Sequence, residues 1–133
     1  MTSKVIYTGN LRTEATHLKS GKIIITDAPT DNNGKGEAFS PTDLVATAAA
    51  SCMMTIMGIK ADAKGLNIDG ASASVNKIMG DNPRHISKIE IVITMPKNDY
   101  SDKDKKLLVA AANGCPVHKT LGEHVEIDSR FEW

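Results

Sequence analysis

The chain has 133 residues, no formal net charge at pH 7, 41% hydrophobic residues and only 4% aromatic residues. This length suits one core, so we expect a single domain over residues 1–133. Without a basic excess or stacking aromatics, we expect neither nucleic acid nor an anionic membrane as a partner. The N-terminal segment lacks the apolar stretch of a signal peptide, which predicts a cytoplasmic protein.

Residues 4–28 alternate in the manner of β-strands. The turn dipeptides Gly9-Asn10 and Ser20-Gly21 interrupt the alternation, and residues 22–26, KIIIT, are mostly β-branched. This pattern predicts an antiparallel meander of three strands. The polar, turn-rich residues 28–39 are expected to form a loop.

Residues 40–60, SPTDLVATAAASCMMTIMGIK, have the composition of one long helix. Ser40 suits the N-cap and Pro41 the first helical position, and the carboxylate of Asp43 favours the positive end of the helix dipole. The rest of the segment is almost entirely small or apolar, which is typical of a helix buried on all sides. It is too short and too interrupted for a membrane span. We expect a central core helix that carries the thiol of Cys52.

The second half of the chain predicts further strands and helices without a repeated βαβ order. The expected elements are strands within residues 65–79, 86–95 and 123–133, a helix over residues 101–114 and a short helical turn over residues 115–121. The isoleucines of residues 86–95 alternate most strongly. The predicted fold class is α+β with a largely antiparallel sheet.

The two cysteines, Cys52 and Cys115, are the first candidates for chemistry. In a reducing compartment such a pair rarely forms a structural disulfide, so the remaining roles are redox chemistry, metal binding or simple burial in the core. Cys115 stands at a helix N-terminus, where the dipole stabilises a thiolate, whereas Cys52 needs a nearby cation. Arg12 is the best candidate for that cation. Composition alone favours an inert core thiol at Cys52.

A metal site is the other chemical possibility. Cys115 and His118 are close in sequence, and Cys52 could supply a third ligand. No paired CxxC or HxxxH motif is present, so we expect no metal and no cofactor.

The chain resembles the OsmC/Ohr family of peroxide-handling proteins over nearly its whole length. The resemblance rests on the N-terminal hairpin with Arg12 and on three segments, SPTDLVATAAASCMMTIMG, PRHISKIEIVI and CPVHKTL. It implies an α+β protomer whose antiparallel sheets wrap around a long central buried helix. It also implies an intertwined homodimer, with the central helices packed together and active sites at the interface.

The resemblance further implies a thiol peroxidase that acts in oxidative or osmotic stress defence. Cys52 matches the peroxidatic cysteine, Cys115 the resolving cysteine and Arg12 the arginine that binds the peroxide. A thiolate that attacks the O–O bond becomes a sulfenic acid and condenses with a second thiol to a disulfide. The implied substrate is an organic hydroperoxide, and the implied reductant is a dithiol such as a lipoylated protein.

The chain departs from the family pattern at the carboxylate that pairs with the arginine. Dedicated enzymes of the family have Asn-Pro-Glu where this chain has Ser40-Pro41-Thr42. A threonine cannot form a bidentate ion pair with a guanidinium. Asp43 or Glu37 is expected to substitute, although Asp43 also suits the plain role of a helix N-terminal charge.

Four further residues are candidates for lining the pocket: His17, His118, Phe39 and Met53. His17, near a hairpin end, could equally face solvent. Phe39 and Met53 would belong to an apolar pocket that favours organic peroxides. The threonine at position 42 keeps an alternative open, a non-catalytic dimer of the same fold that binds a small apolar or sulfur-containing ligand.

Overall fold

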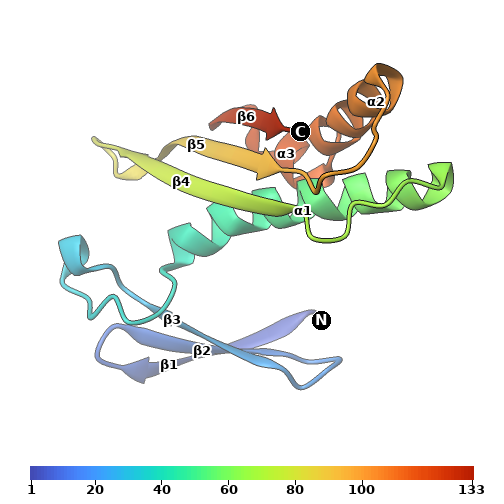
Figure 1. Ribbon diagram of the computed structural model, residues 1–133. Coiled ribbons are helices and arrows are strands. Elements are labelled where there is room, and N and C mark those ends of the chain that lie inside the picture. Colours follow the sequence, from blue (N-terminus) through green and yellow to red (C-terminus); the bar gives the residue numbers. More distant parts are fainter. The chain divides into compact units, whose positions relative to one another are not determined.

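The first part of the chain forms an antiparallel three-stranded sheet. Its strands are β1 (Ser3–Gly9), β2 (Arg12–His17) and β3 (Ile23–Asp27), in the order β1-β2-β3 (Figure 1). A short 3₁₀ helix, η1 (Thr30–Asn32), interrupts the following loop. The predicted meander is therefore confirmed. The computed structural model describes all of residues 1–133, as two compact units, Met1–Val45 and Ala46–Trp133.

The long helix α1 (Pro41–Lys64) has sharp ends at both termini. At the N-terminus, the Ser40 hydroxyl accepts from the Asp43 N–H (3.1 Å) and the Asp43 carboxylate accepts from the Ser40 N–H (2.8 Å). This capping box confirms the predicted start. At the C-terminus, Gly65 has a φ of 67° and the Leu66 N–H donates to the Ala61 carbonyl, as in a Schellman motif. The helix thus extends four residues past the predicted end.

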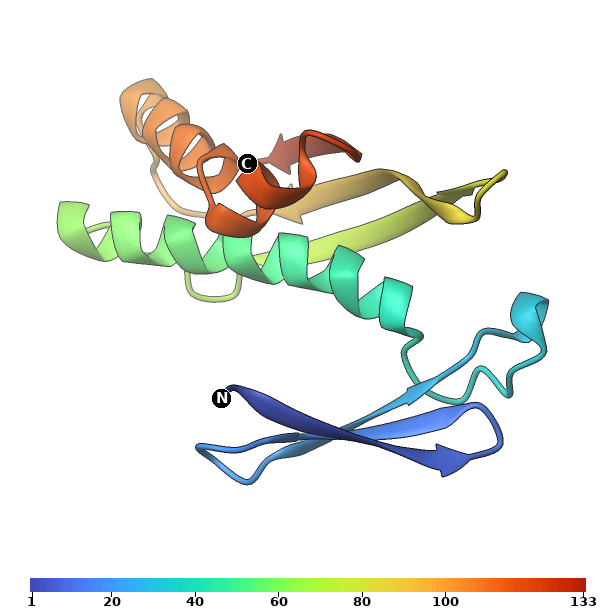
Figure 2. The same cartoon turned by 180° about the vertical axis from the view of Figure 1, so that it is seen from behind.

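The second unit contains the other sheet and two further helices. The sheet consists of β4 (Ser72–Gly80), β5 (His85–Thr94) and β6 (Glu126–Glu132), in the order β4-β5-β6. The helices are α2 (Asp102–Asn113), which begins with a capping box at Ser101, and α3 (Pro116–Leu121). Figure 2 shows α2 and α3 on the same side of this sheet as α1. The fold class is α+β, with two small sheets and three α-helices.

The pairing is largely antiparallel, as expected, with one exception, because β5 and β6 run parallel. A parallel pair needs a long crossover, usually through a helix. Here α2 and α3 lie between the two strands in the sequence. They return the chain to the end of the sheet at which β5 starts, so that β6 can run in the same direction. The chain therefore contains one β-helix-β connection that its sequence pattern did not reveal.

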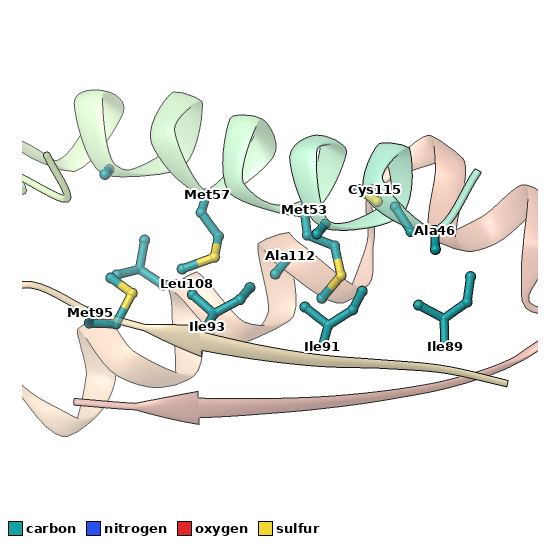
Figure 3. Close-up of a cluster of buried hydrophobic side chains, with 13 residues drawn as sticks. Ala46, Met53, Met57, Ile89, Ile91, Ile93, Met95, Leu108, Ala112 and Cys115 are labelled. Atoms are coloured by element: carbon teal, nitrogen blue, oxygen red, sulfur yellow. The ribbon is translucent and has the colours of Figure 1, made fainter. Parts of the chain in front are cut away.

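The core of the second unit lies between β5 and the helices (Figure 3). Ile89, Ile91 and Ile93 of β5 are fully buried, as their alternation predicted. Met53 and Met57 of α1 meet them from above in this view, and small residues of α1 let the backbones approach closely. Burial of such side chains contributes about 1.5–3 kcal/mol each to folding.

The prediction that α1 is buried on all sides is wrong for the single chain. Its buried residues form one face, Ala46, Ala49, Ala50, Met53, Met57 and Ala61. Ile59 on another face is 61% exposed. By length and composition alone α1 could cross a membrane, but a core helix of a soluble protein meets the same criterion.

An open groove of about 580 Å³ separates α1 from α2 on the outer side of the core. We call it the α1–α2 groove, and its lining is mainly apolar: Ile56, Ile59, Lys60, Ala63, Leu107, Ala110, Ala111 and Gly114. Leu107 lines it, whereas its neighbour Leu108 is fully buried in the core. Substituting each leucine in turn therefore compares the packing on the groove side of α2 with the packing on its core side.

Replacing Leu108 with alanine is expected to lower the free energy of unfolding by about 2–5 kcal/mol, because it leaves a cavity in a packed core. The matched change Leu107→Ala is expected to cost clearly less. Urea unfolding followed by circular dichroism measures both. Equal losses would contradict this difference and would mean that the Leu107 side is covered as fully as the core.

Candidate functional site

Arg12 forms a bidentate ion pair with Asp27 in the first unit. The register of β2 and β3 sets the two residues directly opposite each other. Arg12 Nε donates to Asp27 Oδ1 (2.7 Å) and Nη2 donates to Oδ2 (2.8 Å). The Asp27 side chain is only 1% exposed, against 33% for Arg12. Such fork-to-fork pairing fixes the plane of the guanidinium as well as its position.

Glu37, from the loop after β3, is the second carboxylate on the same guanidinium. Its Oε2 accepts from Arg12 Nη2 at 3.0 Å, and its side chain is 65% exposed. The Glu37 backbone N–H also donates to Asp27 Oδ2 (3.2 Å). Asp27 therefore binds both the arginine and the loop. Glu37 pairs with Arg12 as the sequence suggested, whereas Asp27 was missed.

The mutual effect of Arg12 and Asp27 is visible in their pKa values. Hydrogen bonds from Arg12 hold the pKa of Asp27 below its usual value, against the opposing effect of burial. The same contact raises the pKa of Arg12. Asp27 is therefore a carboxylate near neutral pH. With one cation and two carboxylates, the cluster of Arg12, Asp27 and Glu37 has a formal charge of −1.

Asp43, the other carboxylate considered for Arg12, is the capping-box partner of Ser40. The Thr42 hydroxyl lies 3.0 Å from that of Ser40, also within the first turn of α1. These contacts show Asp43 as a charged residue at the N-terminus of α1, which is the simpler of the two roles expected for it.

The two cysteines lie in the second unit and interact with each other. Both thiols are free; Cys52 is half-buried on α1 and Cys115 is fully buried. Cys115 is the N-cap of α3, and its Sγ accepts from the His118 N–H at 3.3 Å. The Cys52 thiol is close enough to act on the ionisation of Cys115. The fold thus brings together two residues that are 63 positions apart in the chain.

Burial decides the acidity of Cys115. Removal from water raises the pKa of the Cys115 thiol, and the neighbouring Cys52 thiol raises it further. The backbone N–H groups at the start of α3 lower this pKa, as the sequence suggested, but burial outweighs them. Cys115 is therefore a protonated, sheltered thiol near neutral pH.

The remaining candidates lie in different surroundings. His17 is exposed at the end of β2 and its Nδ1 lies 2.7 Å from the Ser20 hydroxyl. His118 is half-buried on α3, and its buried Nδ1 has no hydrogen-bond partner. Phe39 is exposed, whereas Met53 is enclosed in the core (Figure 3). No three His, Cys, Asp or Glu side chains are grouped so that they could hold a metal ion.

Comparison with known proteins shows which family has this sequence and fold. The sequence model of the family described as OsmC-like protein matches residues 34–130. A crystal structure from Psychrobacter arcticus 273-4, of a protein predicted to act in the osmotic stress and detoxification response, is 49% identical. It covers 98% of this chain and 95% of its own, with a TM-score of 0.94. No curated protein matches the chain in sequence.

Two more distant structures share the fold alone. The organic hydroperoxide resistance protein OsmC of Legionella pneumophila is 14% identical, covers 100% of this chain and 98% of its own, and has a TM-score of 0.77. A protein of Vibrio cholerae, predicted to confer organic hydroperoxide resistance, has captopril in one of its active sites. It is 13% identical over 98% of this chain and 91% of its own, with a TM-score of 0.76.

The Asp27–Arg12 pair predicts a specific dependence of stability on pH. Because the folded pKa of Asp27 is lowered, its contribution is complete above the unfolded pKa of about 4 and is lost as the pH falls through the folded value. Asp27→Asn should therefore lower the melting temperature at pH 7 and leave it nearly unchanged at pH 2. Melting curves from pH 2 to 7 measure this, with Glu37→Gln as the exposed control. Parallel curves for Asp27→Asn and wild type would contradict the prediction.

The different burial of the two thiols predicts different reactivity. Iodoacetamide at pH 8 should modify Cys52 at least about tenfold faster than Cys115, because alkylation needs an accessible thiolate. Peptide mass mapping over time measures both rates in one sample. In urea the two rates should converge. Equal rates in the folded protein would show that Cys115 is not sheltered.

Proposed function

The chain belongs to the OsmC-like protein family, and from this premise we propose that it is a cysteine-based peroxidase that reduces organic hydroperoxides. In this proposal it serves oxidative or osmotic stress defence in the cytoplasm. The observation that carries the proposal is the thiol pair, in which the half-buried Cys52 interacts with the buried Cys115. Two free thiols in contact, one accessible and one sheltered, suit a two-step thiol oxidation.

In the first step, the Cys52 thiolate attacks one oxygen of the peroxide and the O–O bond breaks. The departing alkoxide takes up a proton and leaves as an alcohol, while Cys52 becomes a sulfenic acid. In the second step, Cys115 attacks the Cys52 sulfur, forming the S–S bond. The sulfenic oxygen takes up the thiol proton and leaves as water. A dithiol, such as a lipoylated protein, then reduces the disulfide by exchange.

Arg12 is the proposed electrophilic partner of the peroxide. Three of its five N–H groups donate to Asp27 and Glu37, and the two on Nη1 have no acceptor. Directed N–H donors stabilise charge on a departing oxygen. Since the whole cluster is formally anionic, Arg12 is expected to act through these donors rather than through net positive charge.

A homodimer is proposed as the working form. The first sheet exposes hydrophobic side chains on both faces, more than a soluble surface ordinarily carries: Val5, Ile6, Tyr7, Ile23, Ile24 and Ile25. Ile59 on α1 is exposed as well. A second copy of the chain would cover such surfaces, as the intertwined dimer of the family resemblance implies.

A second candidate function is the binding of a small apolar or sulfur-containing ligand without catalysis. The α1–α2 groove favours it, because its volume of about 580 Å³ and its apolar lining suit a small ligand. The groove contains no cysteine, so this binding would leave both thiols reduced.

One equivalent of cumene hydroperoxide is expected to consume both thiols rapidly and to yield a Cys52–Cys115 disulfide, found by mass spectrometry. Cys115→Ser should stop at the Cys52 sulfenic acid, which dimedone traps, because the resolving thiol is missing. Cys52→Ser should retain the Cys115 thiol. Thiols that persist for hours in the wild-type protein would contradict the peroxidase assignment and would favour ligand binding as the function.

A further inference from the structure

We propose that His118 is the general base of the disulfide-forming step, in which its Nδ1 atom takes the proton of the Cys115 thiol. This inference deepens the function proposed above and rests on it. Two features of the second unit support it. The Cys115 thiol is shut off from solvent, and His118 Nδ1 is a buried nitrogen without a hydrogen-bond partner.

The Cys115 thiol has to lose its proton during the second step, because the thiolate is the nucleophile that attacks the Cys52 sulfur. Cys115 is 0% exposed, so bulk water does not reach the thiol. Burial also raises the pKa of Cys115, and the proton therefore stays on the sulfur near neutral pH. The group that accepts this proton has to belong to the protein and to lie beside the thiol.

His118 lies beside the Cys115 thiol. Its backbone N–H donates to Cys115 Sγ at 3.3 Å, so its imidazole ring is within one side-chain length of the sulfur. Helical side chains point back toward the start of their helix, which is the Cys115 end of α3. A Cβ atom on Gly122 would lie 3.5 Å from His118 Cδ2, so the Cδ2 edge of the ring faces Gly122. Nδ1 belongs to the opposite edge.

The Nδ1 atom of His118 is available as a proton acceptor. It is the only buried side-chain nitrogen or oxygen that has no hydrogen-bond partner. Such an atom lowers stability, so native proteins contain few of them, and a catalytic role is one explanation for those that remain. With its proton on Nε2, a neutral imidazole has a free lone pair on Nδ1. Histidine both accepts and returns a proton near neutral pH.

The other groups around Cys115 are unsuited to accept its proton. The backbone N–H groups at the start of α3 are donors, and Cys52 of α1 is the residue under attack. Asp43 of α1 is engaged in its capping box, and the charged residues of α2 lie in its first turns, whereas Cys115 follows its last. Near α3 in the sequence, Lys119, Glu123 and His124 are exposed. Charged residues of β5 and β6 pair with one another on the outer face of the sheet: Lys88, Glu90, Glu126, Asp128 and Arg130.

The proposed step balances in atoms and electrons. His118 Nδ1 takes the Cys115 proton, and the thiolate attacks the Cys52 sulfur, so the S–S bond forms and the S–O bond of the sulfenic acid breaks. The Cys115 sulfur is oxidised and the Cys52 sulfur is reduced. The departing hydroxide takes the proton back from the imidazolium and leaves as water, which returns His118 to its neutral form.

The experiment follows the two steps separately in wild type, His118→Gln and the matched control His124→Gln, which replaces an exposed histidine. One equivalent of cumene hydroperoxide is added, samples are quenched with dimedone over time, and mass spectrometry counts the Cys52 sulfenic acid and the disulfide. His118→Gln should form the sulfenic acid within about twofold of the wild-type rate and convert it to the disulfide about 100-fold more slowly. His124→Gln should change neither step.

Three outcomes of this experiment contradict the proposal in different ways. A wild-type rate of disulfide formation in His118→Gln shows that His118 is not the base. Equal slowing of both steps in that variant shows a structural role, and it also overturns the proposal. A wild-type protein that keeps both thiols overturns the peroxidase function itself, and this inference with it.

The pH dependence of disulfide formation separates a base from a structural residue. In wild type the rate should change little from pH 7 to pH 9. In His118→Gln it should rise about tenfold per pH unit, because hydroxide has to take the proton instead. Parallel pH profiles in the two proteins overturn the proposal.

His118→Phe is the second variant, and it decides the question should His118→Gln fail to fold. Phenylalanine keeps a ring at this position and removes the buried nitrogen without a partner. The melting temperature should therefore be no lower than that of wild type, while disulfide formation is slowed as in His118→Gln. Disulfide formation by His118→Phe at the wild-type rate overturns the proposal.

Discussion

The packing of α1 against β5 is the constraint on which the second unit and its thiols depend. Three isoleucines of β5 and two methionines of α1 fill the space between the two elements, and alanines on α1 allow the close approach (Figure 3). The same layer buries Cys115 and sets Cys52 at its margin. A change of one side chain in such a dense core is felt by its neighbours, so the geometry of the thiols is inherited from this packing.

Burial assigns different chemistry to the two cysteines. Both have the same intrinsic reactivity, yet Cys115 is enclosed and its pKa is raised, whereas Cys52 keeps part of its surface accessible. The helix N-terminus at Cys115 acts against this rise but is too weak to reverse it. A disulfide-forming peroxidase would use the accessible thiol first, to attack the peroxide, and the protected thiol second, to form the disulfide.

The ion pair of Arg12 with Asp27 organises the other unit in a comparable way. A buried carboxylate needs a charged partner, and the arginine across the strand pair supplies it. The lowered pKa of Asp27 keeps that partner ionised across the physiological range. One carboxylate therefore holds an arginine, a strand edge and a loop together, and it leaves one edge of the guanidinium available.

The local features of this protein could be predicted from the sequence alone. The N-cap at Ser40, the helix that follows Ser101, the meander and the alternating isoleucines of β5 depend on neighbours in the chain, and all were predicted correctly. Family membership was also recognisable from the two cysteines and the motifs around them. Glu37 was one of two carboxylates expected to pair with Arg12 in place of the family glutamate, and it does so.

The long-range features could not be predicted in this way, because they depend on how distant segments pack. Asp27 was missed, although the hairpin pattern sets residue 27 opposite residue 12, because pairing register depends on exact turn geometry. The parallel edge strand β6 and the one-sided burial of α1 follow from where distant elements pack. The raised pKa of Cys115 has the same origin, since burial by residues far along the chain outweighs the local helix dipole.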